Sequence, residues 1–367
     1  MDLRPSDDQR LIADAAADFL AEACDAHAMR AVTDSVDGFD RRLWQRIAEL
    51  GWCGVQAPLD DGGLGMGWVE VALLQEQLGR RLACVPYFDS VVLAACVLRA
   101  AGLAGAGLLG EVVAGARVAV VVFDADAGRV RREADGGWQL DGHWPQVSAA
   151  GWADDLLLCA RDQDGALLLL RVPAASVQVR SLQTIDATQR RAEVQAAGVK
   201  LPADACLLRG AALERGLQRT RELGAIALAA SQLGVAQQCL ELAVAYTMQR
   251  VQFGQAIAGF QVVKHRCAQM LVAIEAARSA VHGAAAVADA NPDQAALAFH
   301  AAQALCAATE AAQFAAQEAL QLHGGVGFTW EYDVQLYFKR AQADSVRLGA
   351  LSQWRERVAA QLLDDAP

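Results

Sequence analysis

The spacing of hydrophobic residues predicts that the chain begins with helices. Near the start, apolar residues recur at the three- and four-residue intervals of one helix face at Leu11, Ile12, Ala15 and Phe19. A second amphipathic helix is predicted over 39–50, and Gly51 ends it. A further helix is predicted over 69–79. We therefore expect an N-terminal helical domain over residues 1–115.

The pattern changes to short strands from about Arg117 onward. Runs that are β-branched or alternate between apolar and polar residues, with Asp-Gly and Pro between them, occur at 118–123, 138–142, 155–159, 166–172 and 177–181. Strands at such short intervals are typical of a small antiparallel sheet or a barrel-like domain. We expect this middle β domain over residues 116–212.

Long helices return in the last part of the chain. The sequence predicts nearly uninterrupted helices over 220–249, 261–288, 293–322 and 334–363. Long helices with short connections favour an antiparallel four-helix bundle, expected here over residues 213–367. The predicted fold class is therefore mainly α with a β middle domain.

Composition narrows the class of protein further. The 367 residues are 54% hydrophobic, with a net charge of −11, which argues against a disordered chain and against a nucleic-acid-binding surface. The nine cysteines show no zinc spacing, and neither His265 nor His323 has a carboxylate at ligand spacing, so we expect no metal site. The polar start is unlike a signal peptide, and no apolar run approaches the roughly 20 residues of a membrane span. A cytoplasmic protein is expected.

Two segments carry residues suited to holding a nucleotide. The first is Arg250-Val-Gln-Phe253-Gly254, followed by Phe260-Gln261, and the second is Gln321-Leu-His-Gly-Gly325-Val-Gly. An arginine offers a planar fork to phosphate oxygens, and the Gln321 amide can donate to a phosphate or a ribose. Gly324 and Gly325 lack a Cβ, so that a cofactor can come close to their backbone.

Together with the loop Asp60-Asp-Gly-Gly-Leu-Gly65, these segments resemble the acyl-CoA dehydrogenase family over nearly the whole chain. The resemblance implies FAD as cofactor and α,β-dehydrogenation of an acyl-CoA thioester, with an electron-transfer flavoprotein as a further partner. It also implies that Phe253 lies against the cofactor, and that these elements reach FAD bound mainly by a neighbouring subunit. The family therefore implies an oligomer.

The family's catalytic glutamate is missing at its expected place. Counting without gaps from Gln321 places that position at Leu348, followed by Gly349. Some members carry the base on an early helix of the bundle instead, at the position of Gly224. Glu222 is two residues from there, a turn of about 200° on a helix, which makes it a poor substitute. Asp344 is a more remote substitute.

The middle domain also departs from the family. The loop Thr-Glu-Pro-x-x-Gly-Ser-Asp that touches flavin and substrate in ordinary members is deleted or rewritten between Phe123 and Trp138. The later aromatic segment that packs on the flavin ring is replaced by Gln146-Val-Ser148. Ser148 can still donate a hydrogen bond to the cofactor.

Three hypotheses follow from these gains and losses. The chain is the subunit without catalytic base in a heteromeric, α2β2 acyl-CoA dehydrogenase of steroid or lipid degradation, in which Arg250, Phe253, Gln321, Gly324 and Gly325 supply contacts to the ADP side of FAD. Alternatively, it is a self-sufficient flavoenzyme in which Glu222 or Asp344 replaces the base. The third hypothesis is a structural partner without cofactor contacts.

Overall fold

The computed structural model describes residues 5–364, apart from the side chains of Asp61 and Asp364. The chain forms two compact units. The helical unit holds Met1–Ala31, Gly67–Ala83 and Ala225–Pro367, and the sheet unit holds Val32–Met66 and Cys84–Gly224. The division into three sequential domains at 115 and 212 stays a prediction.

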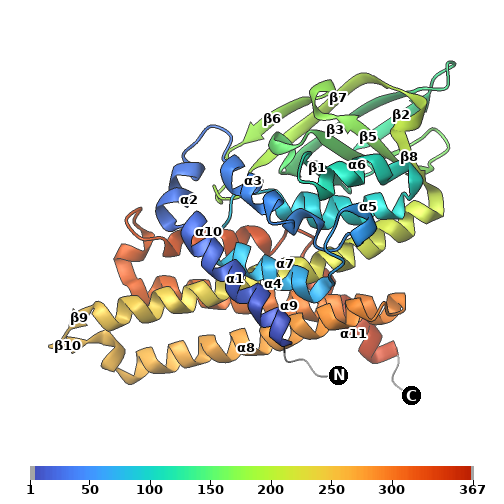
Figure 1. Cartoon of the computed structure of the whole chain (residues 1–367). Coiled ribbons are helices and arrows are strands. Elements are labelled where there is room, and N and C mark those ends of the chain that lie inside the picture. Colours follow the sequence, from blue (N-terminus) through green and yellow to red (C-terminus); the bar gives the residue numbers. More distant parts are fainter. Residues whose placement is uncertain (1–4, 365–367) are drawn as a thin grey trace. The chain divides into compact units, whose positions relative to one another are not determined.

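The sheet unit is built around one eight-stranded sheet (Figure 1). Its strands are β1 (Ala119–Val122), β2 (Gly128–Arg132), β3 (Trp138–Ser148), β4 (Asp155–Arg161), β5 (Leu167–Pro173), β6 (Gln178–Leu182), β7 (Arg191–Leu201) and β8 (Cys206–Arg209). They follow the order β6-β7-β3-β2-β4-β5-β8, and β1 pairs with β4. The aliphatic runs of β4 and β5 are buried along most of their length, as unbroken apolar strands usually are.

The sheet is mixed, whereas the sequence favoured an antiparallel one. Strand β4 pairs in parallel with β1 and β2, and the remaining ladders are antiparallel. Strands β2, β7 and β8 were not predicted. Strand β2 lies inside the stretch read as a rewritten loop, where Arg129, Arg131 and Arg132 face outward and Val130 is buried. A strand with one large apolar residue gives almost no period-two signal.

The helices of the sheet unit begin and end at recognisable signals. The helix α3 (Arg41–Glu49) starts at Asp40, whose carboxylate accepts from the Leu43 amide at 2.9 Å. After Pro86, a buried π-helical segment (Tyr87–Ala94) continues into α5 (Ala95–Ala100), and α6 (Leu103–Val113) follows. Proline is tolerated there because it precedes the first turn.

The helical unit consists of long helices with short connections (Figure 1). They are α1 (Asp7–Ala23), α4 (Trp68–Arg80), α7 (Gly210–Gln249), α8 (Gln261–Asp289), α9 (Gln294–His323), α10 (Val334–Asp344) and α11 (Leu351–Asp364), with α2 (Ala26–Thr33) crossing the unit boundary. Up to Gly224, α7 belongs to the sheet unit. Helix α9 packs on α8, α10 and α11 through a buried face that is mostly alanine.

The fourth predicted helix is in fact two helices. Helix α10 ends at Asp344, and Gly349 in the following connection has φ +109°, a conformation that side chains disfavour. The Trp354 indole donates to the Leu348 carbonyl at 3.2 Å and closes the connection. The sequence predicted one continuous helix here, but the structure has a break. This break lies at the expected position of the family's glutamate.

Two glycines let α4 and α7 approach each other closely. A Cβ on Gly79 would lie 2.1 Å from the Ser231 carbonyl oxygen, and one on Gly234 would lie 1.9 Å from the Glu76 carbonyl oxygen. Both are backbone atoms that cannot move aside. The crossing therefore depends on the absence of side chains at these two positions.

An ion pair between the half-buried Arg278 and the buried Glu76 connects the same helices to α8. The Arg278 guanidinium lies 2.5 Å from Glu76 and also donates to the Gln237 amide oxygen at 3.1 Å. Burial by itself raises the pKa of Glu76, but His282 and Arg278 outweigh it and hold the pKa below its usual value. Glu76 is therefore ionised at neutral pH and neutralised within the helix interface.

Two helices are long and apolar enough to span a bilayer by length and composition, namely α7 and α8. The apolar window of α7 is 83% buried inside the protein, as expected of a core helix, whereas that of α8 is 33% buried. The exposed apolar side chains of α8 thus need a different explanation from those of α7.

Aromatic rings join the ends of α7 and α9. The His323 ring stacks on Tyr246 with centroids 4.3 Å apart, and Tyr332 meets both rings edge-on at 5.7 Å. His323 is buried, and its Nδ1 donates to the Ala319 carbonyl at 2.7 Å. Burial lowers the pKa of His323, and the bond to Ala319 only partly offsets this.

We predict that Gly79→Ala destabilises the protein by about 1–3 kcal/mol, because the new methyl group must push α7 away. Gly107→Ala on α6 is the matched control, since a Cβ there meets open space and alanine favours helix by about 1 kcal/mol. Urea unfolding measures both. Equal effects of the two substitutions would contradict the close crossing.

We also predict that acid weakens the protein partly through His323. Its pKa is lower in the folded than in the unfolded chain, so its contribution is complete above about pH 6.5 and is lost as the pH falls below that value. Between pH 7.5 and 5.5, wild type should lose more unfolding free energy than His323→Asn. His265→Asn, which removes an exposed imidazole, should behave as wild type. A loss that is the same with and without His323 rules this out.

Candidate functional site

A short hairpin follows α7 and carries Arg250 and Phe253. The Arg250 amide closes the last helical turn on Tyr246 at 2.9 Å, and the Arg250 carbonyl accepts from Ile257 at 2.9 Å. Between them, β9 (Val251–Gln252) and β10 (Gln255–Ala256) pair antiparallel. The hairpin is thus fixed at its base, and the exposed Arg250 side chain stands beside it.

The turn of this hairpin places an aromatic ring in a strained position. Phe253 and Gly254 both have positive φ, +51° and +79°, which is the geometry of a type I′ turn. Asparagine is the usual residue before glycine in such turns, because other side chains disfavour this conformation. The Phe253 side chain is 91% exposed and meets only Phe260, edge-on with centroids 6.1 Å apart, among the rings described.

The glycine-rich segment lies directly after α9. Gly324 has φ +64° and donates its amide to the Gln321 carbonyl, which ends the helix. Gly325 has no positive φ, and a Cβ on either glycine would meet nothing within 4 Å. The fold itself therefore requires glycine at 324 but gives no reason for glycine at 325. An exposed backbone without a side chain suits close approach by another molecule.

The aromatic cluster brings these two segments together. Tyr246 lies one turn before Arg250, and His323 immediately precedes Gly324, so the stacked rings hold the hairpin and the glycine loop at one end of the helical unit. Gln321 is exposed on the last turn of the same helix as His323. The segments that carry five of the predicted contact residues therefore lie at the same end of the helical unit.

No ionisable side chain occupies the position expected for the base. Leu348 is half-buried in the connection between α10 and α11. Glu222, in the sheet unit, is 1% exposed and accepts from Gln218 at 3.3 Å. Asp344, in the helical unit, is 2% exposed and lies 3.6 Å from the Arg347 guanidinium. Both carboxylates are buried and engaged by residues three or four positions away.

Ser148 lies in the sheet unit at the end of β3, half-buried and paired in register with Arg191. The next residue, Ala149, has φ +55°, so the backbone turns sharply where the strand ends. Ser148 is therefore the last strand residue before this turn. Its role towards a cofactor stays a prediction.

Sequence reasoning missed two exposed aromatic residues in the glycine-rich region. Phe328 is 71% and Trp330 68% exposed, and the Lys339 ammonium lies 4.4 Å from the Trp330 ring centre. Both residues stand in the printed sequence directly after the glycine turn, but their exposure is a property of the folded chain. Among the residues that the structure describes, no group of His, Cys, Asp and Glu could hold a metal ion.

The helical unit carries groups of the kinds that bind a dinucleotide. Arg250 supplies a phosphate-binding cation, the glycine loop leaves backbone exposed, and Phe253 and Trp330 offer uncovered rings. These groups can bind and orient a dinucleotide. None of these groups of the described helical unit can act as a base that removes a proton from a carbon acid at neutral pH.

Comparison with known proteins agrees with this geometry. The N-terminal domain model of acyl-CoA dehydrogenases matches residues 6–104, and the C-terminal domain model matches residues 215–363. The acyl-CoA dehydrogenase IpdE2 of Mycolicibacterium smegmatis is 31% identical over 97% of this chain and 99% of its own length.

Two solved structures of similar sequence share the fold. The ChsE4-ChsE5 complex from Mycobacterium tuberculosis contains a chain that is 26% identical, with a TM-score of 0.88 and full coverage of both chains. A variant of the Tcur3481-Tcur3483 steroid acyl-CoA dehydrogenase contains one that is 27% identical, with a TM-score of 0.85, covering 97% of this chain and 98% of that one. The predicted fold class is thereby confirmed, and this chain belongs to the acyl-CoA dehydrogenase family, whose cofactor is FAD.

Proposed function

We propose that this chain is the subunit without catalytic base in a heteromeric acyl-CoA dehydrogenase. The observation that carries the proposal is the combination of Leu348 at the base position with an intact hairpin and glycine loop. A chain that had lost all function would have no reason to keep a strained phenylalanine or a glycine that its fold does not need.

Relatives support an assembly of two different subunits. One structural neighbour is a complex of two named chains, and another is named as a steroid acyl-CoA dehydrogenase with two components. By analogy, a sister subunit supplies the catalytic glutamate, the flavin-ring contacts and the thioester pocket. Bulky steroid-type acyl-CoA thioesters are the proposed substrates, and an α2β2 heterotetramer is the proposed assembly.

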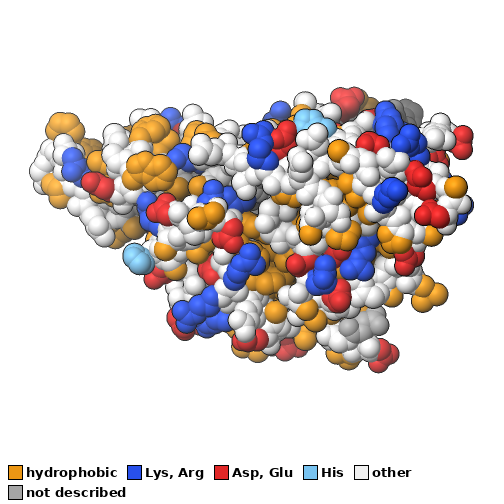
Figure 2. Space-filling view, turned by 90° about the horizontal axis from the view of Figure 1, so that it is seen from above, with side chains coloured by type: hydrophobic (Ala, Val, Ile, Leu, Met, Phe, Trp, Pro, Cys, Tyr) orange, Lys and Arg blue, Asp and Glu red, His pale blue; other side chains and the backbone are white. Residues whose placement is uncertain are grey.

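The surface of the helical unit supports a protein partner. Large apolar side chains are exposed on α8, around the hairpin and after the glycine loop, at Val262, Leu271, Val272, Met248, Val251, Phe253, Phe328 and Trp330. In Figure 2 hydrophobic side chains gather at the end where Figure 1 places β9 and β10. Exposed apolar surface that is contiguous marks an interaction site.

Charges along α8 favour a protein partner over a bilayer. Lys264, His265 and Arg266 are exposed on the same helix as the apolar residues, and Glu275 follows more than two turns later. A helix inside a membrane would have to bury these charges at high cost. A second subunit can meet both kinds of side chain, since interfaces combine apolar centres with polar rims.

This chain's residues would act on the cofactor by binding and orienting it. FAD supplies the hydride-accepting chemistry of the family when bound. Arg250 would neutralise pyrophosphate oxygens, the amides of Gly324 and Gly325 would lie against the nucleotide, and Gln321 would donate to phosphate or ribose. Phe253 would cover an apolar face of the cofactor. We propose the cytoplasm as location and an electron-transfer flavoprotein as electron acceptor.

The self-sufficient enzyme is the second candidate function. It requires Glu222 or Asp344 to accept a substrate proton. Glu222 is bonded to Gln218 within α7, and Asp344 faces Arg347, so each would have to leave its present partner before reaching a substrate. A wild-type chain that oxidises an acyl-CoA alone, and loses this activity in Glu222→Gln or Asp344→Asn, would establish it.

We predict opposite effects of Phe253→Asn on stability and on cofactor binding. Asparagine relieves the positive-φ strain, so the chain expressed alone should gain up to about 1 kcal/mol of unfolding free energy. In the co-expressed assembly, loss of the ring should weaken FAD binding several-fold. Urea unfolding and fluorescence titration of the flavin-free assembly measure the two effects.

Arg250→Gln removes a positive charge from the same hairpin and is the companion substitution to Phe253→Asn. It should weaken FAD binding by about 10- to 100-fold through lost charge-assisted hydrogen bonds, whereas Arg357→Gln, an exposed arginine on α11, should not. Should Arg250→Gln and Phe253→Asn both leave FAD affinity unchanged, the chain is a structural partner without cofactor contacts.

A charge on the exposed face of α8 should break the assembly. Val272 is 70% exposed, and glutamate is a good helix former, so Val272→Glu should fold normally. Burying that carboxylate in an interface should weaken association roughly 100-fold. Sedimentation of the co-expressed pair at several concentrations measures the shift.

Val36→Glu is the control for this experiment, because Val36 is fully exposed and lies outside α8. It should leave the assembly intact. If Val272→Glu co-sediments with the sister subunit as tightly as Val36→Glu does, this face of α8 lies outside the interface.

A further inference from the structure

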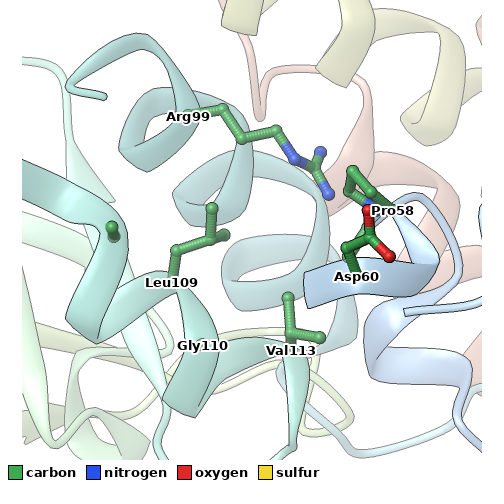
Figure 3. A pocket seen from close by; sticks show the side chains of 8 residues that line it. Pro58, Asp60, Arg99, Leu109, Gly110 and Val113 are labelled. Carbon is green, nitrogen blue, oxygen red and sulfur yellow. The ribbon is translucent and has the colours of Figure 1, made fainter. Parts of the chain in front are cut away.

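The sheet unit contains a cavity on whose walls the dehydrogenase function proposed above places no role. Its volume is about 510 Å³, within the range of small-molecule sites. The walls come from the loop after α3 and from helices α5 and α6. Figure 3 labels six of the lining residues, Pro58, Asp60, Arg99, Leu109, Gly110 and Val113. None of them belongs to the cofactor-contact set proposed above.

Backbone hydrogen bonds fix the shape of this cavity. The Gly63 amide donates to the Pro58 carbonyl at 3.0 Å, and the Gly65 amide donates to the Ala57 carbonyl at 2.8 Å, which folds the loop back on itself. The opposite wall is one face of α6, where a Cβ on Gly110 would meet nothing within 4 Å. The cavity therefore does not depend on the rotamer of a single side chain.

One cation reaches an otherwise aliphatic interior. The Arg99 side chain extends from α5 toward the loop that carries Pro58 and Asp60 (Figure 3). Its Nη1 donates to the neutral Gln56 amide oxygen at 3.2 Å, which leaves further N–H donors of the guanidinium. Among the side chains that the structure describes, no carboxylate forms an ion pair with it. The facing walls are carbon atoms of Leu109 and Val113.

We infer that this cavity binds a small monocarboxylate with an aliphatic or alicyclic body. Its carboxylate would meet the planar fork of Arg99, and its body would displace water from the walls formed by Leu109 and Val113. Both contributions require the two chemical features to be joined in one molecule. A purely polar anion would lack the second contribution, and an apolar alcohol would lack the first.

The charges at the cavity exclude other ligand classes. A phosphate dianion would meet a single guanidinium and the exposed carboxylate of Asp60 at the mouth, so repulsion would offset much of the attraction. A cation drawn to Asp60 would face Arg99. A monoanion held on the Arg99 side is the arrangement that these two charges permit.

Calorimetric titration of the full chain with decanoate tests this inference. Gly110→Phe should fill the cavity and abolish the binding, because a Cβ at this position points into open space. Gly107→Phe, on the same helix and also facing open space but not lining the cavity, should bind as wild type. Thermal unfolding of each variant confirms that it is folded.

Charge variants test the role assigned to Arg99. Arg99→Gln should weaken decanoate binding by about 10- to 100-fold, and Asp60→Asn should strengthen it a few-fold. The affinity of wild type for 1-decanol should be no higher than the affinity of Arg99→Gln for decanoate. Absence of decanoate binding to wild type, full binding to Gly110→Phe, or equal affinity for decanol and decanoate would each overturn the inference.

Discussion

The stack of His323 on Tyr246 is the contact on which the candidate site depends. The two rings lie 4.3 Å apart and join the last turn of α7 to the last turn of α9. Arg250 follows one of these helices and the glycine loop follows the other. Residues that are far apart in sequence thus present a cation and an exposed backbone at one end of the helical unit. The stack therefore holds the ends of these two helices next to each other.

The chain combines retention and loss in a way that fits a shared site. It keeps the strained Phe253 and the sterically unnecessary Gly325, which have a physical reason only if another molecule meets them. It lacks an ionisable group at Leu348, and the two substitute carboxylates are engaged by neighbours in sequence. The exposed apolar face of α8 supports the proposal that a second subunit completes the site.

Much of this was accessible from sequence because the patterns were strong. The long helical periods predicted α7, α8 and α9 to within a few residues at most ends, and the aliphatic runs predicted β1, β4 and β5. The Arg250 and Gln321 segments indicated the family, which the comparisons confirm. Family resemblance thus located candidate contacts that composition alone could not.

Other features were hidden for identifiable reasons. Strand β2 has a single large buried residue, and the parallel pairing of β4 depends on contacts far apart in sequence. The break at Gly349 lay inside continuous helical text, where one glycine is ordinarily tolerated. The Tyr246–His323 stack and the Arg99 cavity form only when elements distant in sequence come together, so no local sequence pattern predicts them.

The most direct test of a shared site is the flavin content of this chain, expressed alone and together with the proposed sister subunit. Absorbance gives flavin per protomer, and mass spectrometry of the native assembly gives subunit composition. A shared site predicts a colourless lone chain and a yellow assembly with fewer flavins than subunits. A lone chain that forms a fully flavin-loaded homo-oligomer and oxidises an acyl-CoA would contradict it.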